Sequence, residues 1–292
     1  QDRYTAAWVG DGALYSNTTG AINTAVGRNS LYTNTTGENN VAVGRRALLG
    51  NTTADDNTAV GTAALQENTT GTQNTAIGNY ALSENTTANQ STAVGYKALY
   101  LATTATVNAA CGDHALYAVT TGSNNVALGH AAGYHLTTGG SNVIIGKDAG
   151  RSNSPSGELT TQSNIVVIGH NAITDLYCKQ STIQTSDLRD KTDITDFEYG
   201  LSWVEKLRPI TYRWDMRSNY KDGVPDGSKK EEKLHLGFIA QEELEIEKEH
   251  GFANDKTDML LVNENVDGNY GMHYDRLIPI LVNAIKELSA KV

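Results

Sequence analysis

The chain has 292 residues and a formal net charge of −10, and it shows no cluster of basic residues. This balance argues against nucleic acid as a partner, because binding to phosphates depends on clustered lysine and arginine. No apolar run approaches the ~20 residues that a bilayer span needs, so we expect no membrane insertion.

The first half of the chain is a repeat. Each unit holds a β-prone triplet that ends at a glycine, such as Thr24–Val26, and a second apolar segment, such as Ala47-Leu48. A unit of 17 residues is too short for two packed helices and fits one coil of a parallel β-solenoid. We therefore predict a mostly β fold in which residues 1–170 form a β-solenoid (β-roll) stalk, with valine and leucine inside and Asn-Thr-Thr-Gly turns at the corners. The glycines that set the period are Gly10, Gly27, Gly44, Gly61, Gly78, Gly95, Gly112, Gly129 and Gly146.

Stacked coils place equivalent residues in columns, with neighbours about 4.8 Å apart. The asparagines that precede the triplets, from Asn23 to Asn142, are predicted to form an amide ladder that is interrupted at Ser91. Such a ladder would satisfy polar groups inside a stack of coils.

The two cysteines do not indicate a disulfide framework. Cys111 stands where other units have Val60 or Ile77, and it is predicted to be a small buried side chain. Neither Cys111 nor Cys178 has Cys or His neighbours at a metal-ligand spacing. We therefore expect no disulfide, no metal site and no cofactor.

The pattern Ser/Asn-x-Ala-Val/Ile-Gly at solenoid spacing resembles the head repeats of trimeric autotransporter adhesins and the similar β-rolls of phage tail fibres. The resemblance covers residues 5–150. It implies that three chains pack side by side, so a trimeric stalk is expected.

Four motifs follow the repeats in a fixed order. The first, at 186–191, reads Ser-Asp-Leu-Arg-Asp-Lys, and the others lie at 206–214, 235–242 and 274–288. This ordered set resembles the endosialidase-type intramolecular chaperone domain at the C-terminus of phage tail spikes and fibres. The resemblance places the domain at 186–292, after a neck at 171–185. It implies a small α+β fold that ends in a coiled-coil-like helix.

In that family the domain trimerises, assists folding of the β-stalk before it, and then cuts itself off. A serine–lysine dyad makes the cut immediately before the serine. The matching residues are Ser186 as nucleophile and Lys191 as general base, and the implied cleavage site is the Thr185–Ser186 bond. The resemblance thus implies a single-turnover autoproteolytic peptidase with no external substrate.

The chemistry is consistent with this spacing. A serine hydroxyl is a weak nucleophile that needs an adjacent base. A lysine amine serves as that base when burial or nearby positive charge favours its neutral form. Five residues of separation are within reach if the segment curls into a turn, and attack on the carbonyl of Thr185 would give an ester that water hydrolyses. The alternative is that Ser186, which charged residues follow, simply caps a helix.

The last segment has apolar residues at three-, four- and seven-residue spacings, which predicts an amphipathic helix. A three-helix seam is preferred, and packing against its own domain is the alternative. We expect Trp203 and Trp214 in the core of this domain, and structural or interfacial roles for His235 and His273. The apolar positions are Leu277, Leu281, Ala284 and Leu288, with Ile278, Ile285 and Val292.

These patterns predict the distal part of a phage tail fibre or spike, made in the bacterial host cytoplasm and located in the virion tail. The expected partners are two further copies of the chain, other tail proteins, and a host surface glycan or outer-membrane receptor. Strands of parallel β-structure pair with segments distant in the sequence, so such structure folds slowly. A C-terminal domain that aligns three chains would lower the barrier to folding. Polar turns offer a contact surface, but no aromatic platform is evident.

The sequence leaves two alternative functions open. A tail-spike polysaccharide depolymerase needs two carboxylates about 5–10 Å apart in a groove; Asp113 and Asp148 are the candidates, interpreted as one column two coils apart. A bacterial trimeric surface adhesin shares the stalk, but it lacks the autocleaving domain and normally ends in a membrane anchor.

Overall fold

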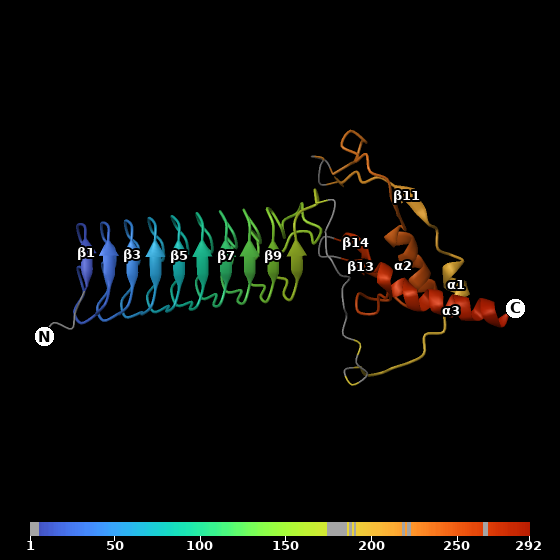
Figure 1. The fold of residues 1–292 in the computed structure, drawn as a ribbon, viewed down its shortest axis with the longest axis horizontal. Coiled ribbons are helices and arrows are strands. Elements are labelled where there is room, and N and C mark those ends of the chain that lie inside the picture. Colours follow the sequence, from blue (N-terminus) through green and yellow to red (C-terminus); the bar gives the residue numbers. More distant parts are fainter. Residues whose placement is uncertain are drawn as a thin grey trace. The chain divides into compact units, whose positions relative to one another are not determined.

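A computed structural model divides the chain into two compact units, Gln1–Ile173 and Thr174–Val292, which are described separately (Figure 1). Thr185, Cys178 and residues 174–185 of the predicted neck lie outside the residues that the structure describes. The described residues are 6–173, 186, 189, 191–217, 220, 223–264 and 268–292.

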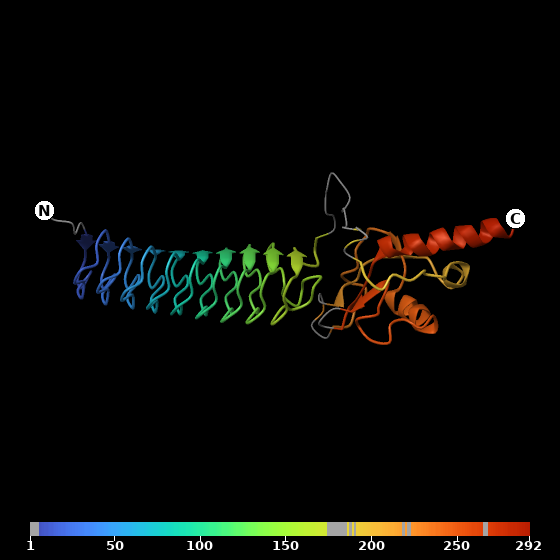
Figure 2. The same cartoon turned by 90° about the horizontal axis from the view of Figure 1, so that it is seen from below.

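The first unit is a parallel β-solenoid, in which the strands line one long side and turns complete each coil (Figure 2). Ten strands form one sheet whose order follows the sequence. Partners such as Ala59 and Ala76 are 17 positions apart, and the final step from Ile145 to Ile168 spans an insertion. The predicted solenoid of 17-residue coils is confirmed. The strands are β1 (Ala7–Val9), β2 (Thr24–Val26), β3 (Val41–Val43), β4 (Thr58–Val60), β5 (Thr75–Ile77), β6 (Thr92–Val94), β7 (Ala109–Cys111), β8 (Val126–Leu128), β9 (Val143–Ile145) and β10 (Val166–Ile168).

Alanine and leucine line most of the solenoid core, and Val167 of β10 is the strand valine buried there. Successive strand residues point to opposite faces. The middle residue of the triplet is buried in β2 to β10, whereas Trp8, in the middle of β1, is exposed. Ala59 is fully buried beside Leu65, whereas Ile77, the third residue of β5, is 42% exposed. The prediction that valines lie inside is therefore wrong for the other strand valines, because a coil this narrow has room for an alanine beside a leucine. Cys111 stands in the same outward position and is exposed, so its predicted burial is also wrong.

The predicted asparagine ladder is present. Asn40 Nδ2 donates to Asn23 Oδ1 over 3.2 Å, and the Asn40 backbone N–H donates to the same oxygen over 2.9 Å. Ser91 interrupts the amides but keeps the ladder polar, because its Oγ accepts the backbone N–H of Asn108 over 3.2 Å. These side chains are buried, so the ladder satisfies donors and acceptors that no water reaches.

A second ladder runs through the turn asparagines, which the sequence presented only as turn formers. Asn51 Nδ2 donates to Asn34 Oδ1 over 2.8 Å and to the carbonyl of Ala54 over 3.0 Å. Asn68 repeats the contact with Asn51 one coil later. From Asn34 to Asn85, this turn is thus held both within its coil and to the coil before it, whereas the later coils have Ala102, Val119 and Leu136 in the same column.

The second unit combines short helices with two antiparallel hairpin-like sheets. β11 pairs with β12, and β13 pairs with β14. Trp203 is fully buried in the core, as predicted, but Trp214 is 45% exposed, so its predicted core position is wrong. No helix in the described ranges has the length and apolar character needed to cross a membrane. The elements are α1 (Leu201–Val204), β11 (Ile210–Tyr212), β12 (His235–Gly237), α2 (Ala240–Glu249), β13 (Val262–Glu264), β14 (Tyr270–Met272), η3 (Tyr274–Arg276) and α3 (Leu277–Ala290).

Helix α3 has two apolar faces. One face packs on its own unit through Leu277, Ile280 and Ala284, which are buried. The other face leaves a row of apolar side chains exposed, with Ile285 at 65%. We call this row the α3 seam; its members, spaced alternately by three and four residues, are Ile278, Leu281, Ile285 and Leu288, followed by Val292 two residues beyond the end of the helix.

Candidate functional site

The structure brings the two predicted dyad residues into contact. Lys191 Nζ donates a hydrogen bond to Ser186 Oγ over 2.7 Å. Both side chains are exposed in the single chain. Thr185, whose carbonyl would be attacked, lies outside the described residues.

This arrangement has the reach that nucleophilic catalysis needs. A base within about 2.6–3.2 Å of a hydroxyl is close enough to take its proton. As an ammonium, Nζ donates to Oγ; after losing a proton it can accept from the hydroxyl instead. Covering the pair from water would favour the neutral amine, because desolvation disfavours charge.

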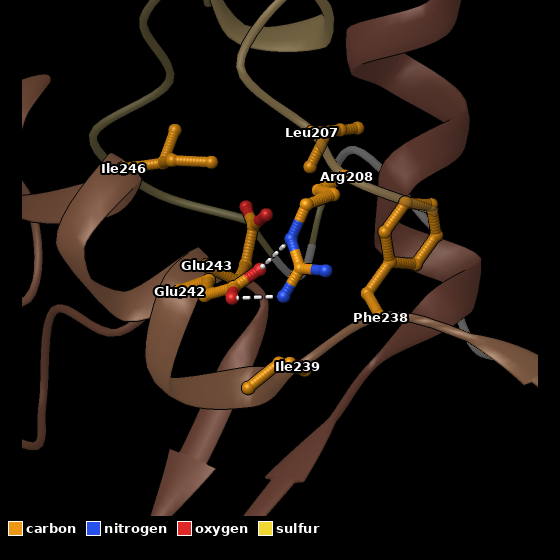
Figure 3. A pocket seen from close by; sticks show the side chains of 7 residues that line it. All are labelled: Leu207, Arg208, Phe238, Ile239, Glu242, Glu243 and Ile246. Carbon is orange, nitrogen blue, oxygen red and sulfur yellow. Dashed lines mark hydrogen bonds and ion pairs between the residues drawn. The ribbon is translucent and has the colours of Figure 1, made fainter. Parts of the chain in front are cut away.

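Two further motif segments meet at the start of α2 (Figure 3). Arg208 binds the carboxylate of Glu242 with two nitrogens, Nε to Oε2 over 3.1 Å and Nη2 to Oε1. The ion pair raises the pKa of Arg208 further above its ordinary value. Glu242 belongs to a motif without an assigned role in the sequence, and the structure gives it a structural role in joining two segments 34 residues apart.

A cavity beside this ion pair is too small for a substrate. It holds about 10 Å³, which is roughly the room for one water molecule. Glu243 lines it and is buried, and its Oε1 accepts the indole N–H of Trp203 over 2.7 Å. Oε2 has no hydrogen-bond partner among the described residues.

The buried carboxyl of Glu243 makes a pH-dependent contribution to stability. Burial raises its pKa above the ordinary 4.5, the Trp203 hydrogen bond opposes this, and the charge of Glu247 adds to the rise. A carboxyl with a raised folded pKa binds more protons when folded, so its contribution is most favourable below pH 4.5 and is lost as pH rises through the folded value. We expect Glu243→Gln to flatten this loss, because glutamine keeps an acceptor for Trp203 without a charge.

Urea unfolding followed by tryptophan fluorescence at several pH values from 4 to 8 tests this expectation. The stability difference between Glu243→Gln and the parent chain should shift in favour of the variant as pH rises. Glu245→Gln, on an exposed acid of the same helix, is the control and should follow the parent. Parallel pH profiles for Glu243→Gln and the parent would contradict the assignment.

Glu247 is a second buried acid of α2, and it holds a strand edge. Its carboxylate accepts the backbone N–H groups of Leu260, Leu261 and Val262 over 2.8, 2.7 and 2.8 Å. These contacts cross 13 to 15 residues of non-repeating chain, so no sequence period indicated them. The first residue of β13 is thereby fixed to α2.

The two acids considered for polysaccharide cleavage do not share a column. Asp113 and Asp148 are 35 residues apart, one more than two periods, so the expected single column is wrong. Both carboxylates approach one imidazole, His130, at 3.8 and 3.9 Å. In the described part of the chain, no group of three or more His, Cys, Asp or Glu side chains is arranged to hold a metal ion.

An aromatic surface does exist on the solenoid, contrary to the sequence reading. Tyr100, Tyr117 and Tyr134 are one period apart and stack, with ring centroids 5.4 and 4.9 Å apart. Tyr80 and Tyr96 contact each other edge to face beside the stack. The 17-residue spacing of these tyrosines is visible in the sequence, but only when the coils are compared position by position.

Comparison with known proteins identifies one part of the chain. Residues 186–252 match the model of the family described as chaperone of endosialidase. No curated protein and no solved structure gave a match. The matched segment begins at Ser186 and contains the Ser186–Lys191 contact and the Arg208–Glu242 pair. The chain therefore carries a chaperone-of-endosialidase domain that follows a β-solenoid in the sequence.

Proposed function

We propose that this chain is the distal part of a phage tail fibre or spike, whose C-terminal domain trimerises, assists folding of the solenoid and then severs itself at Thr185–Ser186. The Lys191–Ser186 hydrogen bond, at the start of the chaperone-of-endosialidase segment, is the observation that carries the cleavage part. In this proposal the mature solenoid resides in the virion tail, joined to other tail proteins, and contacts a host surface glycan or outer-membrane receptor.

Exposed apolar surface in both units supports self-association. In the solenoid, the third residues of the strands form one outward column, which includes the exposed Ile77, Leu128, Ile145 and Ile168. Contiguous apolar surface of this kind marks an interaction surface.

In the second unit, the α3 seam has the three-four spacing of a coiled-coil interface. A groove of about 570 Å³ runs beside it, lined by Phe197, Ile278 and Val282 among others. The groove also has polar walls, at Asp196, Asn283 and Lys286. The apolar seam of a second copy of the helix would match the apolar row of the first.

Assembly would also explain how an exposed dyad becomes active. Covering Ser186 and Lys191 with another chain removes water and favours the neutral amine. Cleavage would then follow assembly and leave the solenoid behind a high unfolding barrier.

The cleavage step is tested with Ser186→Ala and Lys191→Arg. Arginine keeps the positive charge but cannot give up its proton, so it separates a general base from a simple charge partner. Both variants should give only the full-length chain by intact mass, while the parent gives two fragments divided at 185/186. Ser202→Ala and Lys147→Ala are matched controls and should cleave like the parent.

Three outcomes would overturn parts of the proposal. Cleavage near residue 185 in Ser186→Ala excludes that nucleophile, and cleavage in Lys191→Arg at the parental rate excludes the general base. Light scattering of uncleaved Ser186→Ala should give the mass of three chains. The mass of a dimer would refute the trimer. A dimer is the competing outcome because isoleucine at the first (a) and leucine at the fourth (d) position of the heptad repeat favour parallel two-stranded coiled coils.

A further inference from the structure

The solenoid gathers aromatic side chains on four neighbouring coils. Tyr100, Tyr117 and Tyr134 form a stack with ring planes 8° apart, and Arg151 lies over Tyr134 at 5.4 Å from the ring centroid. Tyr80 and Tyr96 stand nearly perpendicular to each other beside the stack. We call these five tyrosines the tyrosine surface.

The fold does not require these rings. At the position of the stacked tyrosines, three earlier coils hold Leu49, Gln66 and Ser83, although the first two coils hold Tyr15 and Tyr32; Asn79 stands in place of Tyr96. Those coils have the same in-register strand pairing. Aromatic residues that the backbone can do without, gathered in one region of a repeat protein, indicate a binding surface.

Polar groups of both kinds surround the tyrosine surface. Lys97 Nζ lies 5.3 Å from the ring centroids of Tyr96 and Tyr100, and Arg151 binds Asp148 over 2.8 Å. Asp113 contacts His114, whose ring lies 5.3 Å from that of Tyr96. Glu84 also hydrogen-bonds with Tyr100, Lys147 lies 4.0 Å from Asp148, and Glu158 pairs with His135 beside Tyr134. Three Lys or Arg side chains are therefore mixed with four Asp or Glu side chains around the rings, which favours a ligand without strong net charge.

We propose that the tyrosine surface binds a neutral polysaccharide, so that this inference rests on the proposed host-contact role. A pyranose ring presents apolar C–H groups on its faces and hydroxyls around its edge. Tyrosine offers a large, rigid contact area with a polar tip, and Tyr96, 42% exposed, offers the most open ring of the five. Lysine and arginine donate to sugar oxygens, and aspartate accepts from sugar hydroxyls.

An extended polymer suits this geometry better than a single sugar. The stacked tyrosines repeat at each coil, so contacts recur along the solenoid axis at about 4.8 Å. A linear chain laid along that axis makes several weak contacts at once, which raises the overall affinity through effective concentration.

The test is binding of the full chain to an array of purified bacterial O-antigen and capsular polysaccharides, both neutral and anionic. Tyr96→Asn and Tyr117→Ser copy residues that other coils already hold at the same positions, so both variants should fold. Each should weaken binding to a neutral polysaccharide by about tenfold or more. Tyr15→Ser is the matched control, because Tyr15 stacks on Tyr32 at 5.1 Å, 73% exposed, away from this surface.

Binding to no neutral polysaccharide, or only to anionic ones, overturns the proposal, as does parental affinity in both tyrosine variants. A change of chain number in Tyr96→Asn by light scattering, without polysaccharide binding by the parent, assigns the surface to contact between copies. Cleavage and chain number measured on the same preparations report the proposed function independently. If both are normal while no polysaccharide binds, this inference alone fails.

Discussion

Gly95→Ala is expected to break the solenoid at its centre. Gly95 has φ +136°, a backbone conformation that residues with a side chain rarely adopt. A Cβ there would lie 2.5 Å from the carbonyl oxygen of Gly112 and 2.6 Å from its carbonyl carbon. That carbonyl belongs to the backbone of the next coil, which cannot move away because the Gly112 N–H donates to Val94 over 2.8 Å.

The cost of this substitution combines backbone strain with overlap, on the order of 4 kcal/mol or more. Coils contact only their neighbours, so one broken step separates the stack into two shorter ones. We expect low soluble yield, loss of β-type circular dichroism and new protease cleavage between residues 95 and 112.

Gly50→Ala is the matched control for Gly95→Ala. Other coils hold Thr33, Glu67 or Glu84 at the position of Gly50, so that column accepts side chains. The control should resist protease like the parent. A Gly95→Ala chain that is equally resistant would show that the glycine column does not set the spacing between coils.

Glu247→Ala is expected to unfold the C-terminal unit. Removing the carboxylate leaves the buried N–H groups of Leu261 and Val262 and the partly buried N–H of Leu260 without an acceptor. Each costs about 1–3 kcal/mol, and the sum is comparable with the whole stability of a small domain. The Trp203 fluorescence should report an unfolded environment in the absence of denaturant.

Glu247→Gln gives an intermediate result that identifies the cause. Its remaining oxygen can accept two of the three N–H groups, because Oε1 serves both Leu261 and Val262. Glu249→Ala, which removes an exposed acid paired with Lys206, should change stability by less than about 1 kcal/mol. Equal stability of the alanine and glutamine variants at position 247 would exclude this hydrogen-bond account.

The sequence predicted what the repeat dictates. A glycine that must recur at each coil fixes the register, so the strands, the Asn23 column and the coil length could all be foreseen. Which strand residues face inward could not be foreseen. Alternation alone does not say whether Ala59 or Val60 is buried, and alanine is the buried one because the narrow coil leaves little room beside the leucine.

Side-chain contacts in the second unit were harder to predict from the sequence. The proximity of Ser186 and Lys191 follows from five residues of separation, and the structure places them within hydrogen-bond distance. The contact of Trp203 with Glu243 joins residues 40 apart in a chain without a period. Such pairs depend on how the whole unit packs, which local pattern does not encode.

The equivalence of successive coils has a consequence for how the solenoid forms. A folding chain that skips one coil can pair β3 with β5 and find the same asparagine and glycine columns, while 17 residues bulge out. Such mispaired states lie close in energy to the native one, which makes them kinetic traps. Irregular positions in the buried columns, such as Ser91 and the insertion before β10, are few, so we expect correct phasing to be imposed from the ends of the stack.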